Sequence, residues 1–196
     1  MIPIILLHGL GAHTFTLLPL ELWLNYQGYT NTFNLKYPVN DMVFEDILEY
    51  IDKEFTKLFD KNEEIIIIGQ SYGGVVANNI HKKGWKVKKS ICIGSPLHGA
   101  NLLNELEKIL PTWFTNYMYK IPYDFLKNKN KELEPPHPYH TISLGWFYTD
   151  FDGCVYKDET ILNHYNHTHL SWTDHRTVFF NPRLWITVTN LIKNDL

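Results

Sequence analysis

An unbroken apolar run that ends in a glycine-rich turn constrains this chain more than any other feature. Four consecutive isoleucines, Ile65 to Ile68, are followed at once by Gly69-Gln70-Ser71-Tyr72-Gly73-Gly74 and then by the apolar Val75 and Val76. A run that is apolar on both faces is typical of a central parallel strand, and the segment after it is expected to be helical. The chain is therefore predicted to contain a buried strand that turns sharply into a helix, with a serine at the turn.

The spacing Gly-x-Ser-x-Gly fits a strand-to-helix turn that is too tight for side chains at the flanking positions. Gly69 and Gly73 lie two residues before and two residues after Ser71, where neighbouring backbone approaches so closely that a Cβ atom would clash. Such a turn presents the serine at the N-terminus of the helix, where free amides and the helix dipole favour developing negative charge. This context predicts a serine nucleophile, and a simple glycine-rich turn is the alternative.

Short apolar runs alternate with longer segments of helical periodicity along the chain, as in an open parallel sheet covered by helices. The six candidate strands are Ile2 to Leu7, Asn31 to Leu35, Glu64 to Ile68, Ser90 to Ile93, His140 to Leu144 and Thr168 to Trp172. One clear helix has apolar residues from Val43 to Phe59 with Asp41 as its expected N-cap, and another begins at Asn181-Pro182. The predicted fold class is α/β, with about six mostly parallel strands and helices on both faces.

The length of 196 residues fits a single domain spanning residues 1–196. Residues 101–138 interrupt the alternation with several prolines and a concentration of aromatic side chains, among them Trp113, Phe114 and Tyr117. This stretch is interpreted either as a lid or wall over a substrate pocket or as a helical excursion whose aromatic residues pack in the core. Because it is too short for a full cap domain, the site is expected to be comparatively open.

Charge and composition exclude several classes of partner. The chain has 18 Lys and Arg against 21 Asp and Glu, a formal net charge of -3, which does not indicate a nucleic-acid or anionic-membrane partner. No signal peptide is expected, and no apolar run approaches the roughly 20 residues that span a bilayer. The cysteines Cys92 and Cys154 are interpreted as reduced thiols. We therefore expect a cytoplasmic protein with at most peripheral membrane contact, while the sequence does not indicate its oligomeric state.

A second glycine-rich loop follows the first predicted strand. Because His8-Gly9-Leu10-Gly11 comes directly after that strand, the loop is expected at the same carboxyl edge of the sheet as Ser71. An acyl transfer needs two preorganised N–H donors for the oxyanion, and the amides of Leu10 and Tyr72 are the candidates. His8 is expected to brace the loop by hydrogen bonds.

The order of these motifs resembles that of the α/β-hydrolase family, and within it the small lipases and esterases. The resemblance rests on Leu6-Leu7-His8-Gly9-Leu10-Gly11, Gly69-Gln70-Ser71-Tyr72-Gly73-Gly74, Ile93-Gly94-Ser95-Pro96-Leu97-His98-Gly99-Ala100, Asp152-Gly153-Cys154-Val155 and Thr173-Asp174-His175. It implies an acid and then a histidine downstream of the serine. The chain departs from the family at Gln70, where a histidine is frequent, and at His98, which lies one position late in its segment.

Asp152 and His175 are the predicted partners of the serine. Asp152 follows the fifth predicted strand, and the Asp-Gly pair places a carboxylate on a tight turn; Asp150 and Asp158 are its competitors. His175 lies in the loop beyond the last predicted strand, from which it can reach the serine, whereas His169 lies inside that strand.

Two alternative chemistries, a metal site and a cysteine nucleophile, have less support in the sequence. A metal site made of His167 and His169 has neither a nearby cysteine nor a helical His-x-x-x-His pattern to support it. Cys154 has no base or helix terminus beside it that would lower its pKa, so it is expected to be a packing residue. No metal and no cofactor are expected.

The sequence thus predicts a serine hydrolase that cleaves a carboxylic ester with an apolar acyl part through an acyl-enzyme. Ser71 is the nucleophile, His175 the base and Asp152 the residue that orients the base. Leu97 joins Trp113 and its aromatic neighbours as a candidate contact for the small-molecule ester or lipid substrate. A thioesterase, amidase or acyltransferase would use the same residues, and a non-catalytic lipid-binding protein with this fold is a further alternative.

Overall fold

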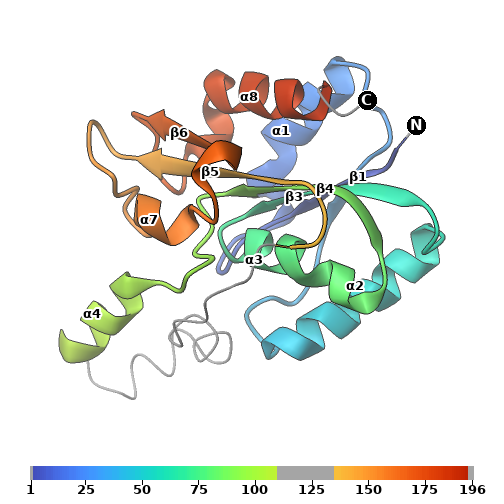
Figure 1. Cartoon of the computed structure of the whole chain (residues 1–196), viewed down its shortest axis with the longest axis horizontal. Helices are drawn as coiled ribbons and strands as arrows, with labels where there is room; N and C mark the ends of the chain where they lie inside the picture. The colour runs from blue at the N-terminus through green and yellow to red at the C-terminus, as the bar shows by residue number, and fades with distance from the viewer. Residues whose placement is uncertain (1, 110–134, 194–196) are drawn as a thin grey trace.

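The structure is a computed structural model of the chain, which describes residues 2–109 and 135–193. Its centre is a six-stranded sheet in the order β2-β1-β3-β4-β5-β6, in which every neighbouring pair is parallel (Figure 1). The strands are β1 (Ile4–Leu7), β2 (Thr32–Leu35), β3 (Glu64–Gln70), β4 (Lys86–Ile93), β5 (Tyr139–Gly145) and β6 (His167–Ser171). This sheet confirms the predicted fold class and all six predicted strands.

Helices cover both faces of the sheet. The helices are α1 (Thr14–Tyr26), α2 (Phe44–Leu58), α3 (Tyr72–Asn79), α4 (Asn101–Ile109), α7 (Lys157–Thr160) and α8 (Pro182–Lys193), with short 3₁₀ turns η1 (Ile80–Lys83), η2 (His164–Asn166) and η3 (Val178–Phe180). In Figure 1, α1 and α8 lie above the sheet, while α2 and α3 lie below it. The sheet therefore separates two hydrophobic cores.

The four isoleucines of β3 divide between the two cores because successive side chains of a strand point to opposite faces. Ile65 and Ile67 pack under α2 and α3, whereas Ile66 and Ile68 pack under α1 and α8. All four are at most 1% exposed. Burial of such a side chain contributes about 1.5–3 kcal/mol, so the two cores hold β3 firmly in the centre of the sheet.

Of the two predicted helix starts, that of α2 is wrong and that of α8 is confirmed. Asp41 is not the N-cap of α2, a position that Val43 occupies, because the N–H of Asp41 is held in a turn by the carbonyl of Pro38 (3.2 Å). α8 begins as predicted, and Asn181 Oδ1 accepts a hydrogen bond from the N–H of Arg183 (2.9 Å).

Since all six strands are parallel, the loops that follow them gather at one edge of the sheet, toward which the arrowheads of β5 and β6 point in Figure 1. Leu7 of β1 is the register partner of Gly69 in β3, and Gln70 is the partner of Ile93 in β4. The loops after β1, β3 and β4 are therefore adjacent. Ligands of open α/β sheets bind at this carboxyl edge.

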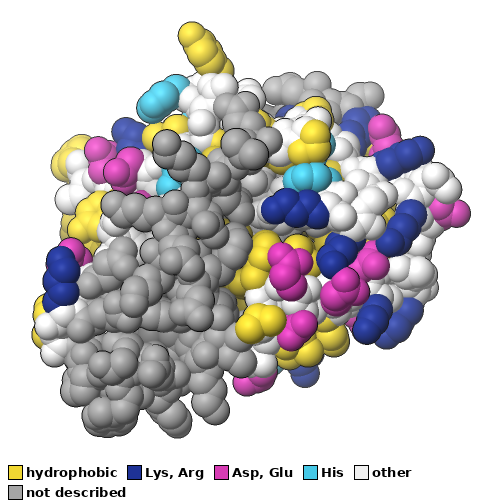
Figure 2. Space-filling view, turned by 60° about the horizontal axis from the view of Figure 1, so that its bottom comes forward, with side chains coloured by type: hydrophobic (Ala, Val, Ile, Leu, Met, Phe, Trp, Pro, Cys, Tyr) yellow, Lys and Arg dark blue, Asp and Glu magenta, His cyan; other side chains and the backbone are white. Residues whose placement is uncertain are grey.

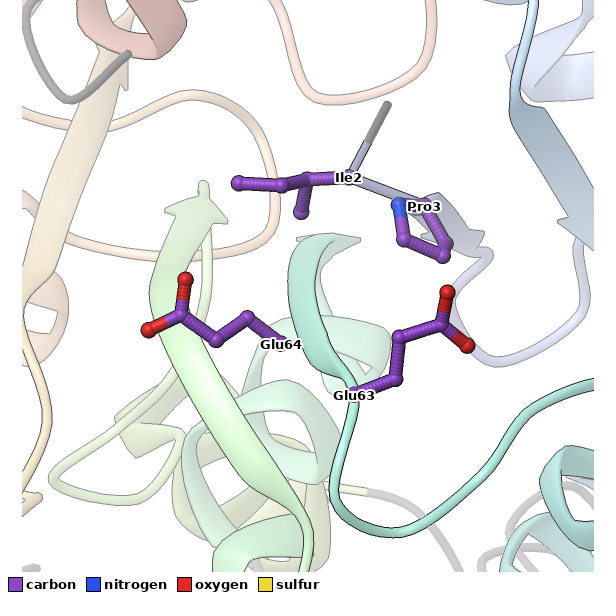
Figure 3. Close-up of a pocket in the computed structure, with 4 residues that line it drawn as sticks. All are labelled: Ile2, Pro3, Glu63 and Glu64. Carbon is purple, nitrogen blue, oxygen red and sulfur yellow. The ribbon is translucent and has the colours of Figure 1, made fainter.

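The opposite edge carries a shallow hollow of about 250 Å³, shown in Figure 3. It is lined by Ile2, Pro3, Glu63 and Glu64, at the start of β1 and β3. The hollow lies at the edge of the sheet opposite to Ser71, at which open α/β sheets do not usually bind their ligands.

The surface carries charges of both signs. On the face that Figure 2 shows, Lys and Arg side chains are interspersed with Asp and Glu over the described part. Ion pairs between side chains of opposite charge include Lys61–Asp52 (2.8 Å) and Lys57–Glu54 (2.5 Å). No helix among residues 2–109 and 135–193 is both long and apolar enough to cross a membrane.

Candidate active site

Ser71 lies between β3 and α3 in a backbone conformation that residues with a side chain rarely adopt, with φ 53° and ψ −125°. A Cβ atom on Gly69 would lie 2.2 Å from the carbonyl oxygen of Gly73, and one on Gly73 would lie 2.2 Å from that of Leu7. The N–H of Ser71 donates to the carbonyl of Ile93 (2.8 Å), which fixes the turn to the end of β4. The geometry is that of a tight strand-to-helix turn with a partly exposed serine.

Asp152 and His175 form a buried hydrogen-bonded pair in the loops after β5 and β6. His175 Nδ1 donates to Asp152 Oδ2 at 2.7 Å, and the two residues are 8% and 1% exposed. The other carboxylate oxygen accepts the N–H groups of Cys154 (2.9 Å) and Val155 (2.7 Å). Because Nδ1 carries the proton in this bond, the lone pair of a neutral His175 ring is on Nε2, the nitrogen that a general base would use.

Ser71 and His175 are not joined by a hydrogen bond within the described part of the chain. In substrate-free enzymes this contact is often long and tightens when substrate binds. The backbone nevertheless holds the histidine loop close to the acid, since the N–H of His175 donates to the carbonyl of Asp152 (3.0 Å).

Gly94, the residue after β4, lies against this pair and was not singled out from the sequence. It has a φ of +52°, and a Cβ atom there would lie 3.2 Å from Asp152 Oδ2 and 3.3 Å from His175 Nδ1. Its N–H donates to the carbonyl of Ile142 (2.7 Å). A side chain at this position would press on Asp152 and His175, a constraint that becomes visible only in the fold.

The competing residues lie elsewhere. Asp150 is exposed and faces Lys157 at 3.4 Å, and Asp158 is in the first turn of α7. His169 lies within β6, and its Nδ1 is bonded to Ser143 Oγ (2.8 Å) on the neighbouring strand. None of these three residues is bonded to Asp152 or His175 in the described structure.

Two backbone amides of the loop after β1 donate hydrogen bonds to side chains. The N–H of Gly9 donates to Gln70 Oε1 (3.2 Å), and the N–H of Gly11 donates to Asn40 Oδ1 (2.9 Å). The N–H of Leu10, between them, has no hydrogen-bond partner among the described residues. Leu10 lies on the loop after β1, and Tyr72 is the first residue of α3.

His8 braces this loop from inside the fold. Its ring is 2% exposed, stacks on Tyr37 with 4.6 Å between the centroids, and bonds through Nδ1 to the carbonyl of Gly9 (3.1 Å). The Tyr37 hydroxyl donates to the carbonyl of His8. Burial lowers the pKa of His8, so its ring is neutral at pH 7.

The predicted substrate contacts are only partly described. The side chains of Leu97 and Tyr72 are at most 1% exposed and belong to the core under α2 and α3, against which the half-buried Leu10 packs. The other three predicted contacts lie outside the described residues: Trp113, Phe114 and Tyr117.

A group of exposed aromatic side chains, which we call the aromatic rim, was missed by the sequence analysis. It consists of Trp146, Phe147 and Tyr148 after β5 and Trp172 after β6, each more than half exposed. The rings of Phe147 and Tyr148 contact Trp172 edge to face, with centroid distances of 5.0 Å and 4.9 Å. Three consecutive aromatic residues shortly before Asp152 were the signal in the sequence.

The backbone of the aromatic rim is strained at two positions. Phe147 and Trp172 have φ values of 54° and 60°, which are outliers for bulky residues. The N–H of Trp172 donates to the carbonyl of Phe147 (3.2 Å), and the N–H of Thr173 donates to that of Gly145 (3.0 Å). These bonds hold the loops that carry Asp152 and His175 side by side.

Cys154 and the histidines of β6 do not form a second centre. Burial and the nearby Asp152 carboxylate raise the pKa of Cys154, which leaves the thiol protonated. His167 is bonded to Thr141 (2.8 Å) and Ser143 (2.9 Å). Within residues 2–109 and 135–193, no three His, Cys, Asp or Glu side chains are grouped so that they could hold a metal ion.

Comparison with known families gives one partial match. Residues 37–131, just under half of the 196, match the model of the PGAP1-like alpha/beta domain. This match includes β3, Ser71 and α3. No curated protein matches the sequence significantly.

Solved structures resemble the whole described fold. The mature lipase BlEst2 of Bacillus licheniformis has a TM-score of 0.71 at 18% identity, covering 96% of this chain and 91% of that chain. The esterase PF2001 of Pyrococcus furiosus has a TM-score of 0.66 at 15% identity, covering 98% and 82%. Phospholipase PlaB of Legionella pneumophila, in complex with thio-NAD, has a TM-score of 0.67 at 15% identity and covers 83% and 45%. At these identities the likeness establishes a shared fold.

Proposed function

Because the chain has the α/β-hydrolase fold, we propose that it is a serine hydrolase that cleaves carboxylic esters with an apolar acyl part through an acyl-enzyme. One observation carries the proposal. A serine in a strained turn at the start of α3 lies at the same sheet edge as a buried Asp152–His175 pair joined at 2.7 Å. A nucleophile on a strand-to-helix turn, followed along the chain by an acid and a histidine, has the order of this fold's catalytic triad.

In this mechanism Ser71 Oγ attacks the carbonyl carbon of the ester while His175 Nε2 takes the hydroxyl proton. Asp152 holds Nδ1 and stabilises the imidazolium that forms. Collapse of the tetrahedral intermediate breaks the bond to the alcohol, which leaves with the proton from His175. Water then attacks the acyl group on Ser71 with His175 again as base, and the carboxylic acid is released.

The oxyanion of the tetrahedral intermediate needs N–H donors that are already in place. The amides of Leu10 and Tyr72 are proposed for this role. Support comes from the N–H of Leu10, which has no partner among the described residues and lies between two amides with side-chain partners. The position of Tyr72 at the N-terminus of α3 supports the second donor. Removal of one such donor typically lowers kcat by about 10²–10³.

The preference for an apolar acyl part is supported by the surroundings of the site. The aromatic rim extends from the two loops that bear Asp152 and His175. Leu10 is a half-buried apolar side chain on the loop that is proposed to bind the oxyanion. Two of the proteins with a similar fold are a lipase and an esterase.

Labelling with a fluorophosphonate probe, together with hydrolysis of p-nitrophenyl esters of increasing acyl length, tests the proposal. Ser71→Ala is expected to abolish labelling and to lower kcat by about 10⁵–10⁶, the loss seen when a triad serine is removed. Cys154→Ala is the matched control, because it removes the rival nucleophile yet keeps the backbone N–H that binds Asp152. This control is expected to label and hydrolyse like the wild type.

Two results would contradict the proposal. Folded wild-type protein that neither labels nor hydrolyses any ester would exclude the hydrolase, and labelling that survives in Ser71→Ala would exclude this serine. Hydrolysis of a parallel panel of thioesters and amides tests which bond the protein cleaves. Turnover of a thioester or an amide that is faster than turnover of the ester would make that compound the proposed substrate class.

A further inference from the structure

Two side-chain carboxamides hold the loop that is proposed to bind the oxyanion, one on each side of Leu10. Gln70 accepts the N–H of Gly9, and Asn40 accepts the N–H of Gly11. Gln70 is the last residue of β3, and Asn40 lies in the loop that follows β2. β2 and β3 flank β1 in the sheet, so the loop after β1 is held from both sides.

Gln70 also reaches the base. Its Nε2 donates to the carbonyl of His175 (3.2 Å), while its Oε1 accepts from Gly9, and the side chain is 95% buried. A carboxamide is the side-chain group that supplies one acceptor and a donor at this reach. A carboxylate would set a second acceptor against the carbonyl of His175, and an apolar side chain would leave buried polar groups without partners.

The loop between the two carboxamides has little freedom to move. A Cβ atom on Gly9 would lie 2.7 Å from Ser71 Cβ and 2.9 Å from Gln70 Oε1, so this backbone is in close contact with the elbow. Gly11 has a φ of +64° and is turned by its bond to Asn40. Fixing the amides at both sides fixes the direction of the N–H of Leu10.

We propose that Gln70 and Asn40 are positioning residues that aim the Leu10 N–H at the oxyanion, and that Gln70 ties this aim to the placement of His175. The inference rests on the proposed function, and it explains why a glutamine directly precedes Ser71. Neither residue touches the substrate in this proposal. Each is therefore expected to change kcat, by stabilising the transition state, and to leave KM nearly unchanged.

The Asn40 arm is tested by a pair of variants at an exposed position. Asn40→Ala removes the acceptor of Gly11 N–H, whereas Asn40→Asp keeps it. In Asn40→Ala we expect kcat for a p-nitrophenyl ester to fall roughly 10-fold with KM within about 3-fold of wild type, a part of the loss from deleting a whole donor. Asn40→Asp is expected to recover most of that loss.

Two variants of Gln70 distinguish the roles of the two hydrogen bonds that its side chain makes. Gln70→Met breaks both, and Gln70→Glu keeps an acceptor for Gly9 while the ionised carboxylate loses the donor to His175. We expect Gln70→Met to lower kcat by roughly 10²-fold, comparable with loss of one oxyanion donor. Gln70→Glu is expected to shift the acidic limb of the pH profile of kcat/KM, which reports the free-enzyme base.

Inhibition by a trifluoromethyl ketone of the same acyl chain provides the decisive readout, because its adduct with Ser71 carries the oxyanion. The inhibition constant is expected to rise in parallel with the loss of kcat, while KM stays nearly constant. A merely structural defect would instead lower the amount of labelled enzyme without changing the inhibition constant.

The outcomes distinguish a failure of the proposed function from a failure of this inference. Inactive wild-type protein would overturn the proposed function and this inference together. Active wild-type protein, with Asn40→Ala folded and its kcat and inhibition constant unchanged, would overturn the inference alone. If Gln70→Met does not fold, the exposed Asn40 pair still tests the role of Asn40, and Gln70→Glu tests the role of Gln70.

Discussion

The positions that shape the candidate site include residues without a side chain. A Cβ atom on Gly73 would lie 2.2 Å from the carbonyl oxygen of Leu7 and 2.7 Å from that of His8. Both contacts are to backbone of β1 and its loop, which cannot rotate away as a flexible side chain would. The elbow and the loop with the proposed oxyanion donor are therefore in direct contact through Gly73.

Gly73→Ala is predicted to lower the free energy of unfolding by at least about 3 kcal/mol, because β1 and the elbow must separate to admit the methyl group. Gly84→Ala is the matched control. Gly84 has a φ of +84° with nothing within 4 Å of an added Cβ atom, so its replacement costs only the conformational strain, about 1 kcal/mol. Urea denaturation followed by circular dichroism measures both, and equal losses would contradict the steric account.

Individual residues of the candidate site were predictable from the sequence where a local rule applied. Asp152 and His175 were placed by their positions after predicted strands, and the structure brings them together at 2.7 Å. The contacts of Gln70 followed no local rule, since they reach residues 61 and 105 positions away. No pattern in one sequence relates a glutamine to loops so distant.

At the scale of elements, the strands followed the apolar pattern and the exceptions have physical causes. β4 begins at Lys86, whereas the prediction began at Ser90, because lysines are rare in strands. Lys89 is buried and reaches the carbonyl of Leu191 with its Nζ (3.1 Å), a partner at the end of α8 that the sequence does not reveal. Tertiary contacts thus extend the strand beyond its apolar part.

α1 was not predicted, since its apolar residues do not lie on one face. Leu17, Leu20 and Leu24 are buried, but Leu18 and Leu22 are 37% and 59% exposed. A helix that is apolar on several sides has no clear period of 3.6 residues. Its surroundings are β1, β2, η3 and α8, which only the fold brings together.

Asn181 provides a test of how α8 is attached to the site. Its Oδ1 caps the helix through Arg183 N–H (2.9 Å), and its Nδ2 donates to Thr173 Oγ1 (2.8 Å) in the loop that carries His175. Asn181→Ala is predicted to lower the free energy of unfolding by about 1–2 kcal/mol, the usual effect of losing a cap. Asn181→Asp keeps the cap but not the donor, so urea denaturation should place it between the wild type and the alanine variant. A stability loss in Asn181→Asp as large as in the alanine variant would assign the effect to the bond with Thr173.

For the molecule as a whole, the buried His137 and the half-buried His140 and His167 make stability depend on pH. Burial lowers the pKa of His137, His140 and His167 to about 4, whereas an unfolded chain holds them near 6.5. The unfolded state therefore binds more protons between these values, and stability present above pH 6.5 is lost as the pH falls through about 4. Glu159, whose pKa is raised by burial, acts in the opposite sense, with stability lost as the pH rises.

The free energy of unfolding is predicted to fall between pH 7 and pH 4, by roughly 1–3 kcal/mol for each of these histidines, with the smaller values for the half-buried His140 and His167. His137→Gln should flatten this dependence, because the ring that bonds Ser90 Oγ (3.1 Å) no longer titrates. His164→Gln, at an exposed histidine, is the control and should follow the wild type. Urea midpoints across this range give the slopes, and identical slopes for wild type and His137→Gln would contradict the assignment.

The parallel sheet also determines when the candidate site can exist during folding. The bond from Gln70 to His175 spans 105 positions, and the bond from Trp23 to Thr189 spans 166. Contacts of such sequence separation form late, because the chain entropy of closing long loops is lost before the contacts compensate it. During synthesis, β1, β3 and Ser71 leave the ribosome well before β6 and the histidine loop. A nascent chain is therefore without the complete set of proposed triad residues until the last strand has joined the edge of the sheet.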